Sequence, residues 1–120
     1  LMIYTIASGE TRFVAAQVLA LLDDDLWLRT AAPANAMARD LAAATAGIPG
    51  VALTGPPEVN SVFARVPASA IEPLQAWSFF WEWDRTESLV RWMTSFTTTP
   101  DDVARFAAGV RALVAHHLPA

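Results

Sequence analysis

The chain has 120 residues, of which 54% are hydrophobic, and a net charge of −4 at pH 7. This length suits one domain with a core of its own. The basic residues are scattered and form no stripe or cluster, which argues against nucleic acid as a partner. No apolar run is long enough to span a membrane, and the absence of cysteine excludes disulfides and thiolate metal sites. This composition is compatible with a cytoplasmic protein.

Two helices are predicted first. Residues 11–22 are apolar almost all round, so we expect this helix to be buried against other protein, either the chain's own sheet or a second chain. The second helix is predicted over 24–45, with the carboxylates of 23–25 capping its start. Pro33 predicts a kink or a break inside this helix, and the glycines and proline of 47–50 end it.

The rest of the chain alternates between strands and helices. Short strands are expected at 51–54, 61–66, 79–83 and 88–95. A helix is predicted over 68–76, and a last helix begins at Pro100, with Thr99 as its N-cap and Asp101 and Asp102 in its first turn. This order predicts an α+β fold, in which a small antiparallel or mixed sheet is covered by helices on one face and preceded by two helices.

The strand over 88–95 carries an arginine among apolar residues. Arg91 shares one face of the strand with Leu89 and Met93. The other face carries Val90 and Trp92, so both faces are apolar and the strand is predicted to be central. A buried guanidinium needs an anion, and arginine binds a carboxylate through two parallel hydrogen bonds. The sequence therefore indicates Arg91 as a carboxylate-binding residue; the alternative is a side chain that reaches solvent or pairs with a nearby acid.

Other candidate groups have simpler interpretations. His116 and His117 are adjacent, so on a helix their rings diverge and cannot easily bind one metal ion. The carboxylates of Glu82 and Asp84 are suited to acid–base work, but a solvated hairpin end is the favoured interpretation. The tryptophans within 77–92 indicate a core or a buried interface rather than a base-stacking surface. No phosphate-binding loop, nucleophile elbow or metal-ligand spacing is present, so no metal site is predicted.

Several segments resemble, in their order and spacing, the C-terminal part of threonine aldolases. These enzymes belong to the aromatic amino-acid β-eliminating lyase/threonine aldolase group of fold-type-I pyridoxal-phosphate enzymes. The segments are TRFVAAQ (11–17), LWLR (26–29), ANAMAR (34–39), NSVFA (60–64) and VRWMTSFTT (90–98). The chain departs from the family at 8–11, where members often have a Gly-rich or Ser-Ser-Lys-Met run, and at Ser95, where histidine is frequent. These departures leave the substrate and the reaction within the group open.

The resemblance implies that residues 1–120 are a C-terminal small domain, and that a large cofactor-binding domain lies upstream. In the family the lysine that carries pyridoxal 5'-phosphate is on that large domain, and this chain has no lysine at all. The implied activity is a lyase that cleaves β-hydroxy-α-amino acids to glycine and an aldehyde, with no catalytic residue and no activity in this piece alone. Arg91 aligns with the arginine that binds the substrate α-carboxylate, and Arg12 with an arginine near the cofactor phosphate. A homo-oligomer is also implied.

Two rival hypotheses follow from the same residues. The chain could be a stand-alone interaction or dimerisation module that has this fold but no catalytic role. It could instead belong to another fold-type-I enzyme, one that catalyses β-elimination or transamination, because the fold does not fix the chemistry. The sequence upstream of Leu1 separates the first rival from the aldolase, and substrate tests on the full-length protein separate the second.

Overall fold

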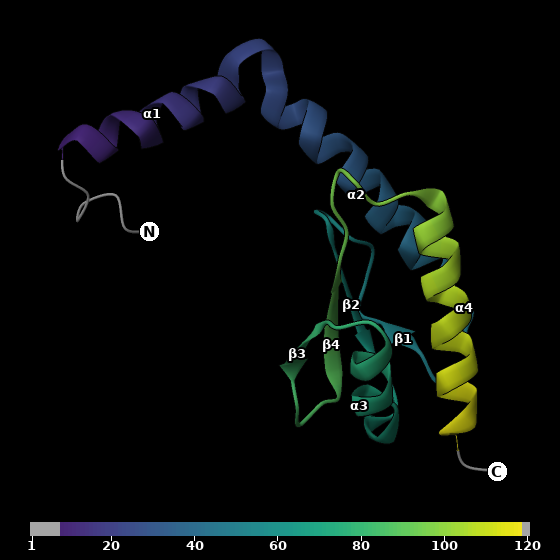
Figure 1. The fold of residues 1–120 in the computed structure, drawn as a ribbon. Helices are drawn as coiled ribbons and strands as arrows, with labels where there is room; N and C mark the ends of the chain where they lie inside the picture. The colour runs from purple at the N-terminus through teal and green to yellow at the C-terminus, as the bar shows by residue number, and fades with distance from the viewer. Residues whose placement is uncertain (1–7, 119–120) are drawn as a thin grey trace.

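The structure is a computed structural model that describes residues 8–118, leaving out the side chains of 8–13, 21 and 24. The helices are α1 (Ser8–Leu22), α2 (Leu26–Thr45), α3 (Ala68–Trp77) and α4 (Pro100–His116), with a short 3-10 turn, η2 (Asp23–Asp25), between the first two. The strands are β1 (Ala52–Leu53), β2 (Ser61–Arg65), β3 (Trp81–Asp84) and β4 (Leu89–Met93). The predicted α+β fold is confirmed (Figure 1).

The strands form one antiparallel sheet in the order β1-β2-β4-β3. β4 therefore has a neighbour on both sides, and the prediction that it is central is confirmed. One face of the sheet packs against α2, α3 and α4. The core residues from that face are Val62 and Ala64 of β2 and Val90 and Trp92 of β4. Because side chains alternate along a strand, the residues between these lie on the opposite face, which none of the described helices covers (Figure 1).

The start of α4 is fixed by a reciprocal cap, in which Thr99 is the N-cap that the sequence predicts. The Thr99 hydroxyl accepts a hydrogen bond from the backbone N–H of Asp102 at 3.1 Å, and the Asp102 carboxylate accepts one from the backbone N–H of Thr99 at 3.0 Å. The Thr99 N–H, followed by the Arg105 guanidinium, lowers the pKa of Asp102 below its ordinary value of 3.8. The cap determines where α4 begins relative to the end of β4.

The start of α2 differs from the prediction. Residues 23–25 form η2, and Asp25 adopts the left-handed conformation (φ 56°) as N-cap without a side-chain capping bond. The predicted carboxylate cap is therefore wrong at this N-cap, because the chain turns here instead of presenting an extended capping residue. α2 also continues through Pro33 to Thr45, so the predicted break does not occur.

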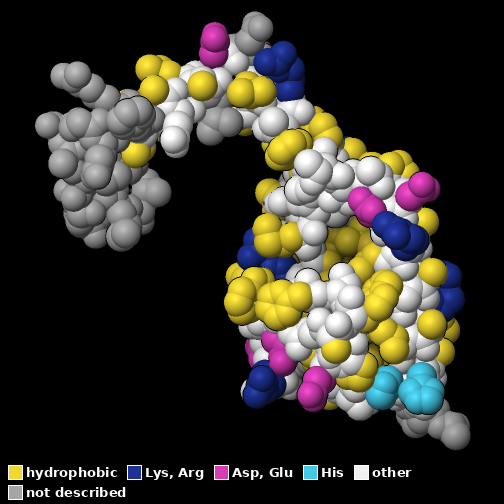
Figure 2. Space-filling view, viewed as in Figure 1, with side chains coloured by type: hydrophobic (Ala, Val, Ile, Leu, Met, Phe, Trp, Pro, Cys, Tyr) yellow, Lys and Arg dark blue, Asp and Glu magenta, His cyan; other side chains and the backbone are white. Residues whose placement is uncertain are grey.

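α1 projects away from the body formed by the sheet and the other helices (Figure 1). The described side chains from 15 to 20 and that of Leu22 are exposed; Val18 is 47% and Leu19 65% accessible. Hydrophobic side chains lie along this arm (Figure 2). The sheet of this chain therefore does not cover the helix, although its apolar composition predicts burial. Over the described range, no helix combines the length and the apolar character that crossing a membrane requires.

Candidate functional site

Arg91 lies at the middle of β4, on the sheet face that the helices leave open. Antiparallel pairing places it between Phe63 of β2 and Trp81 of β3. Its side chain is partly exposed, whereas its neighbours Val90 and Trp92 point into the core and are buried. Because side chains alternate along β4, Val90 and Trp92 pack into the core on one face, and Arg91 places its charge on the other.

Among the described residues, one side chain hydrogen-bonds the Arg91 guanidinium and one makes a cation–π contact with it. Its Nε donates a hydrogen bond to the hydroxyl of Ser61 at 3.2 Å. Its Cζ lies 5.3 Å from the ring centroid of Trp83, within the range of a cation–π contact. Trp83 in turn packs edge-on against Phe63, with centroids 5.2 Å apart and an interplanar angle of 73°. The guanidinium is therefore oriented by neighbours from β2 and β3, neither of which neutralises it.

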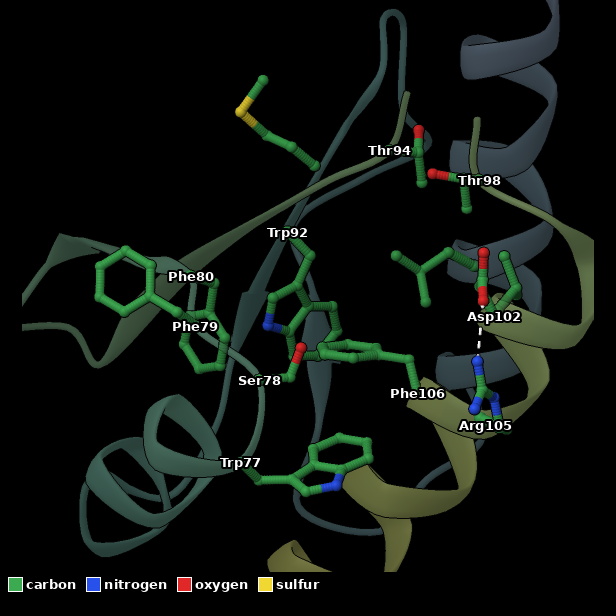
Figure 3. A pocket seen from close by; sticks show the side chains of 13 residues that line it. Trp77, Ser78, Phe79, Phe80, Trp92, Thr94, Thr98, Asp102, Arg105 and Phe106 are labelled. Carbon is green, nitrogen blue, oxygen red and sulfur yellow. Dashed lines mark hydrogen bonds and ion pairs between the residues drawn. The ribbon is translucent and has the colours of Figure 1, made fainter. Parts of the chain in front are cut away.

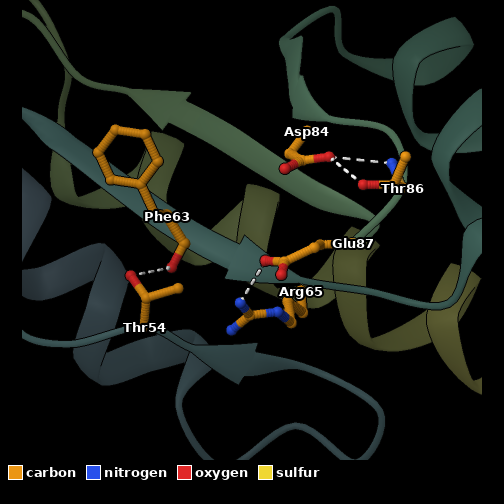
Figure 4. Close-up of polar contacts among 6 residues, drawn as sticks. All are labelled: Thr54, Phe63, Arg65, Asp84, Thr86 and Glu87. Atoms are coloured by element: carbon orange, nitrogen blue, oxygen red, sulfur yellow. Dashed lines mark hydrogen bonds and ion pairs between the residues drawn. The ribbon is translucent and has the colours of Figure 1, made fainter.

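No carboxylate among the described residues forms an ion pair with Arg91. The ion pairs are Arg65–Glu87, Arg85–Glu82 and Arg105–Asp102. Figure 4 shows the first of them, in which Arg65 of the open face reaches Glu87 at 2.6 Å. The interpretation of Arg91 as the partner of an internal acid is therefore not supported in the described part of the chain.

Glu82 and Asp84 make contacts that stabilise the turn between β3 and β4. The Asp84 carboxylate accepts hydrogen bonds from the Thr86 backbone N–H at 3.0 Å and from its hydroxyl at 2.7 Å (Figure 4). The Thr86 hydroxyl bond lowers the pKa of Asp84. Glu82 binds Arg85 within the same turn. These contacts agree with a hairpin end rather than with an acid–base pair.

The open face around Arg91 is rich in exposed apolar side chains. Trp81 is 65%, Trp83 57% and Met93 54% accessible. Of the tryptophans from 77 to 92, only Trp92 is buried, so the core interpretation is correct for that residue alone. The others lie on the surface of this chain, where they could line an interface or a ligand cleft.

A cavity of about 590 Å³ lies on the other side of the sheet, between the end of β4, the end of α3 and the first turns of α4 (Figure 3). Its walls include the aromatic side chains of Trp77, Phe80, Trp92 and Phe106. The cation on its rim is Arg105, which already pairs with Asp102. The cavity extends to Met93 at the end of β4, but Arg91 does not line it, so the cavity and the arginine do not form one site.

Three of the segments that resemble threonine aldolases meet beside Arg91. The buried Thr94 hydroxyl donates to the Ala34 carbonyl of α2 at 2.6 Å. The Asn60 amide donates to the Thr94 carbonyl at 2.8 Å, and the Thr94 N–H donates to the Asn60 carbonyl at 2.9 Å. These bonds fix the end of β4 and the start of β2, where Ser61 contacts Arg91.

Sequence reasoning selected Arg91 as a candidate but did not predict its contacts with Ser61 and Trp83. Ser61 lies within a segment that resembles the family, yet its contact depends on the register of β2 against β4. Arg12 belongs to α1, and its side chain lies outside the described part of the chain, so its predicted role stays a prediction. In the part that the structure describes, no group of three or more metal-ligating side chains is present.

Comparison with known proteins supports the resemblance. No family model matches the chain. The chain is 38% identical over 109 residues to a low specificity L-threonine aldolase of Pseudomonas aeruginosa, and 37% identical over 109 residues to a protein of the same name from a Pseudomonas species. The resemblance to threonine aldolases is confirmed. Each comparison covers 89% of this chain but 31% of the relative, so the chain spans about a third of the length of these threonine aldolases.

Proposed function

We propose that residues 1–120 are the C-terminal small domain of a pyridoxal-phosphate-dependent lyase of threonine-aldolase type. The whole enzyme cleaves β-hydroxy-α-amino acids to glycine and an aldehyde. The observation that carries this proposal is Arg91, a cation on a central strand that has no acidic partner among the described residues and lies on an open, apolar face. The identity of 37–38% to threonine aldolases supports the same function.

The role of this chain is to bind and orient the substrate. Arg91 binds the α-carboxylate, because a guanidinium offers N–H donors in a planar fork that matches a carboxylate. The apolar side chains around it exclude water from the bound group. When bound, pyridoxal 5'-phosphate withdraws electrons from the substrate and so supplies the bond-breaking chemistry. The chain has no lysine to hold that cofactor, which fits a cofactor-bearing lysine in an upstream large domain.

Arg12 contributes to binding of the cofactor phosphate in this proposal. Its support is the segment around Arg12, which resembles the family, and its position in α1. α1 itself is covered by the upstream domain and by a second copy of the enzyme, since a helix that is apolar on all sides needs cover on more than one of them. The enzyme is accordingly a homo-oligomer, and the absence of cysteine is compatible with a cytoplasmic location.

The test is turnover by the full-length protein loaded with pyridoxal phosphate. Release of glycine and acetaldehyde from threonine is the expected result, and the 120-residue chain alone should be inactive because it lacks a lysine. Formation of pyruvate or of a keto acid instead of glycine would favour β-elimination or transamination. Absence of any reaction with amino acids would favour the non-catalytic module.

Arg91 variants test the residue that carries the proposal. A charge-assisted hydrogen bond contributes about 1.5–3 kcal/mol, so Arg91→Ala should lower kcat/KM for threonine by roughly ten- to a hundredfold. Arg91→Lys should restore little, because an ammonium cannot form the planar fork. Arg65→Ala is the matched control, since Arg65 lies on the same open face but is paired with Glu87. An Arg91→Ala enzyme with unchanged affinity for amino acids contradicts the proposal.

A further inference from the structure

We infer that Ser61 and Trp83 are positioning residues that make Arg91 bind a carboxylate end-on, through Nη1 and Nη2, rather than side-on through Nε. This inference deepens the proposed function and rests on it. It concerns how the carboxylate meets the guanidinium and which neighbours decide that geometry.

The first step is the bond to Ser61. Arg91 Nε carries a single N–H, and that N–H is donated to the Ser61 hydroxyl at 3.2 Å. Ser61 is buried (3% accessible) on β2, and its backbone is paired with β4, so the hydroxyl is held in place. A carboxylate that bound side-on would need Nε together with one Nη, and Ser61 already uses the Nε donor.

The second step is the ring of Trp83. It lies over the guanidinium at 5.3 Å and is itself supported by Phe63. The ring therefore lies next to the cation and restricts the rotamers that the end of the Arg91 side chain can adopt. Trp83 is 57% accessible, so this packing leaves the end of the guanidinium open.

Together the contacts with Ser61 and Trp83 leave the Nη1–Nη2 edge of the Arg91 guanidinium for a ligand. Within the described residues, no acceptor is bonded to Nη1 or Nη2 of Arg91, so the N–H groups of these two nitrogens remain for an incoming carboxylate. Two parallel bonds from Nη1 and Nη2 fix both the position and the plane of the carboxylate. Loss of either neighbour frees the guanidinium to rotate and weakens carboxylate binding in particular.

The experiment compares two ligands on the full-length holoenzyme by calorimetry. Glycine carries a carboxylate, and 2-aminoethanol has a hydroxymethyl group in its place. We expect Ser61→Ala and Trp83→Leu each to raise the Kd of glycine by roughly three- to tenfold, with little change for 2-aminoethanol. Ser61→Thr keeps the hydroxyl and should restore glycine binding. Trp77→Leu is the control, because Trp77 is also an exposed tryptophan but stacks on Phe106 of α4 and has no assigned role at Arg91.

Equal weakening of both ligands by the Ser61 and Trp83 variants would assign these residues a general structural role and overturn the inference, as would unchanged affinity for both. A crystal structure of the glycine complex gives the second measurement. A carboxylate on Nη1 and Nη2, with Ser61 still on Nε, supports the inference, and a carboxylate on Nε refutes it. A protein that binds glycine through Arg91 but cleaves no β-hydroxy amino acid contradicts the proposed reaction alone. Failure to bind glycine overturns both.

Discussion

The ring of Trp77 packs against Gly109, in the space that a side chain at position 109 would occupy. Gly109 lies in the third turn of α4, and a Cβ placed on it would lie 2.6 Å from Cζ2 of Trp77 and closer still to two other atoms of the same ring. The Trp77 ring, stacked on Phe106 with centroids 5.7 Å apart, thus occupies the space that any other residue at 109 needs. We predict that Gly109→Ala destabilises the domain, although alanine is the better helix former.

The magnitude follows from two opposing effects. Alanine in place of glycine inside a helix contributes about 1 kcal/mol of stability. The added methyl group displaces the Trp77 ring, which is 49% accessible and so buries about half of its surface, or roughly 100 Å². Exposing that area costs about 2.5 kcal/mol. The net prediction is a loss of about 1.5 kcal/mol in the free energy of unfolding.

A double-mutant cycle provides the decisive measurement. In a Trp77→Ala background the steric conflict is gone, so Gly109→Ala should stabilise the chain by up to about 1 kcal/mol. Urea unfolding of the four proteins gives the values, provided that the m-value stays constant. Ala112→Gly is the matched control: this exposed position of α4 should lose about 1 kcal/mol in either background. A Gly109→Ala substitution with the same effect in both backgrounds refutes the reasoning.

Three further predictions concern the α4 cap and the projecting helix. Thr99→Ala should lower the free energy of unfolding by about 1 kcal/mol, and Thr99→Ser should retain most of it, as measured in urea. The lowered pKa of Asp102 means that its stabilising contribution is present above its ordinary value of 3.8 and is lost as the pH falls through the folded-state pKa. Asp102→Asn should therefore flatten the acid limb of a stability–pH curve, and an unchanged limb would refute this. Leu19→Glu on α1 should lower the sedimentation coefficient of the full-length oligomer. Gln17→Glu is the control and should leave that coefficient unchanged, because Gln17 lies on the same exposed helix but is already polar.

Elements with strong local signals could be predicted from the sequence. The helix from Pro100 was predicted because Thr99, the proline and the acidic residues all indicate the same start, and the structure forms the complete cap. The central position of β4 followed from apolar residues on both of its faces. The start of α2 could not be predicted, because Asp23–Asp25 are good caps by composition and the left-handed backbone of Asp25 depends on how α1 and α2 are joined.

The candidate site was predictable only in part, for a different reason. A charged residue inside an apolar strand is visible in sequence, which is why Arg91 stood out. Its neighbours are not visible, because Ser61 and Trp83 come from strands that meet β4 in a register set by the whole sheet. Which face of β4 the helices cover is likewise a tertiary outcome. Trp83 and Trp92 illustrate this: both are tryptophans of predicted strands, but only Trp92 is buried in the core.

Under the proposed function, the open face of the sheet links substrate binding to the assembly of this domain with an upstream one. Among the described residues Arg91 has no acidic partner, and it can remain so because it is partly exposed and lies against Trp83. An upstream domain that covered this face would remove water from the guanidinium, and a charge that loses water without gaining a counter-ion is strongly destabilised. In the proposed enzyme, the substrate carboxylate is that counter-ion. We therefore expect the two domains to close more tightly on Arg91 when an amino acid is bound than when the site is empty.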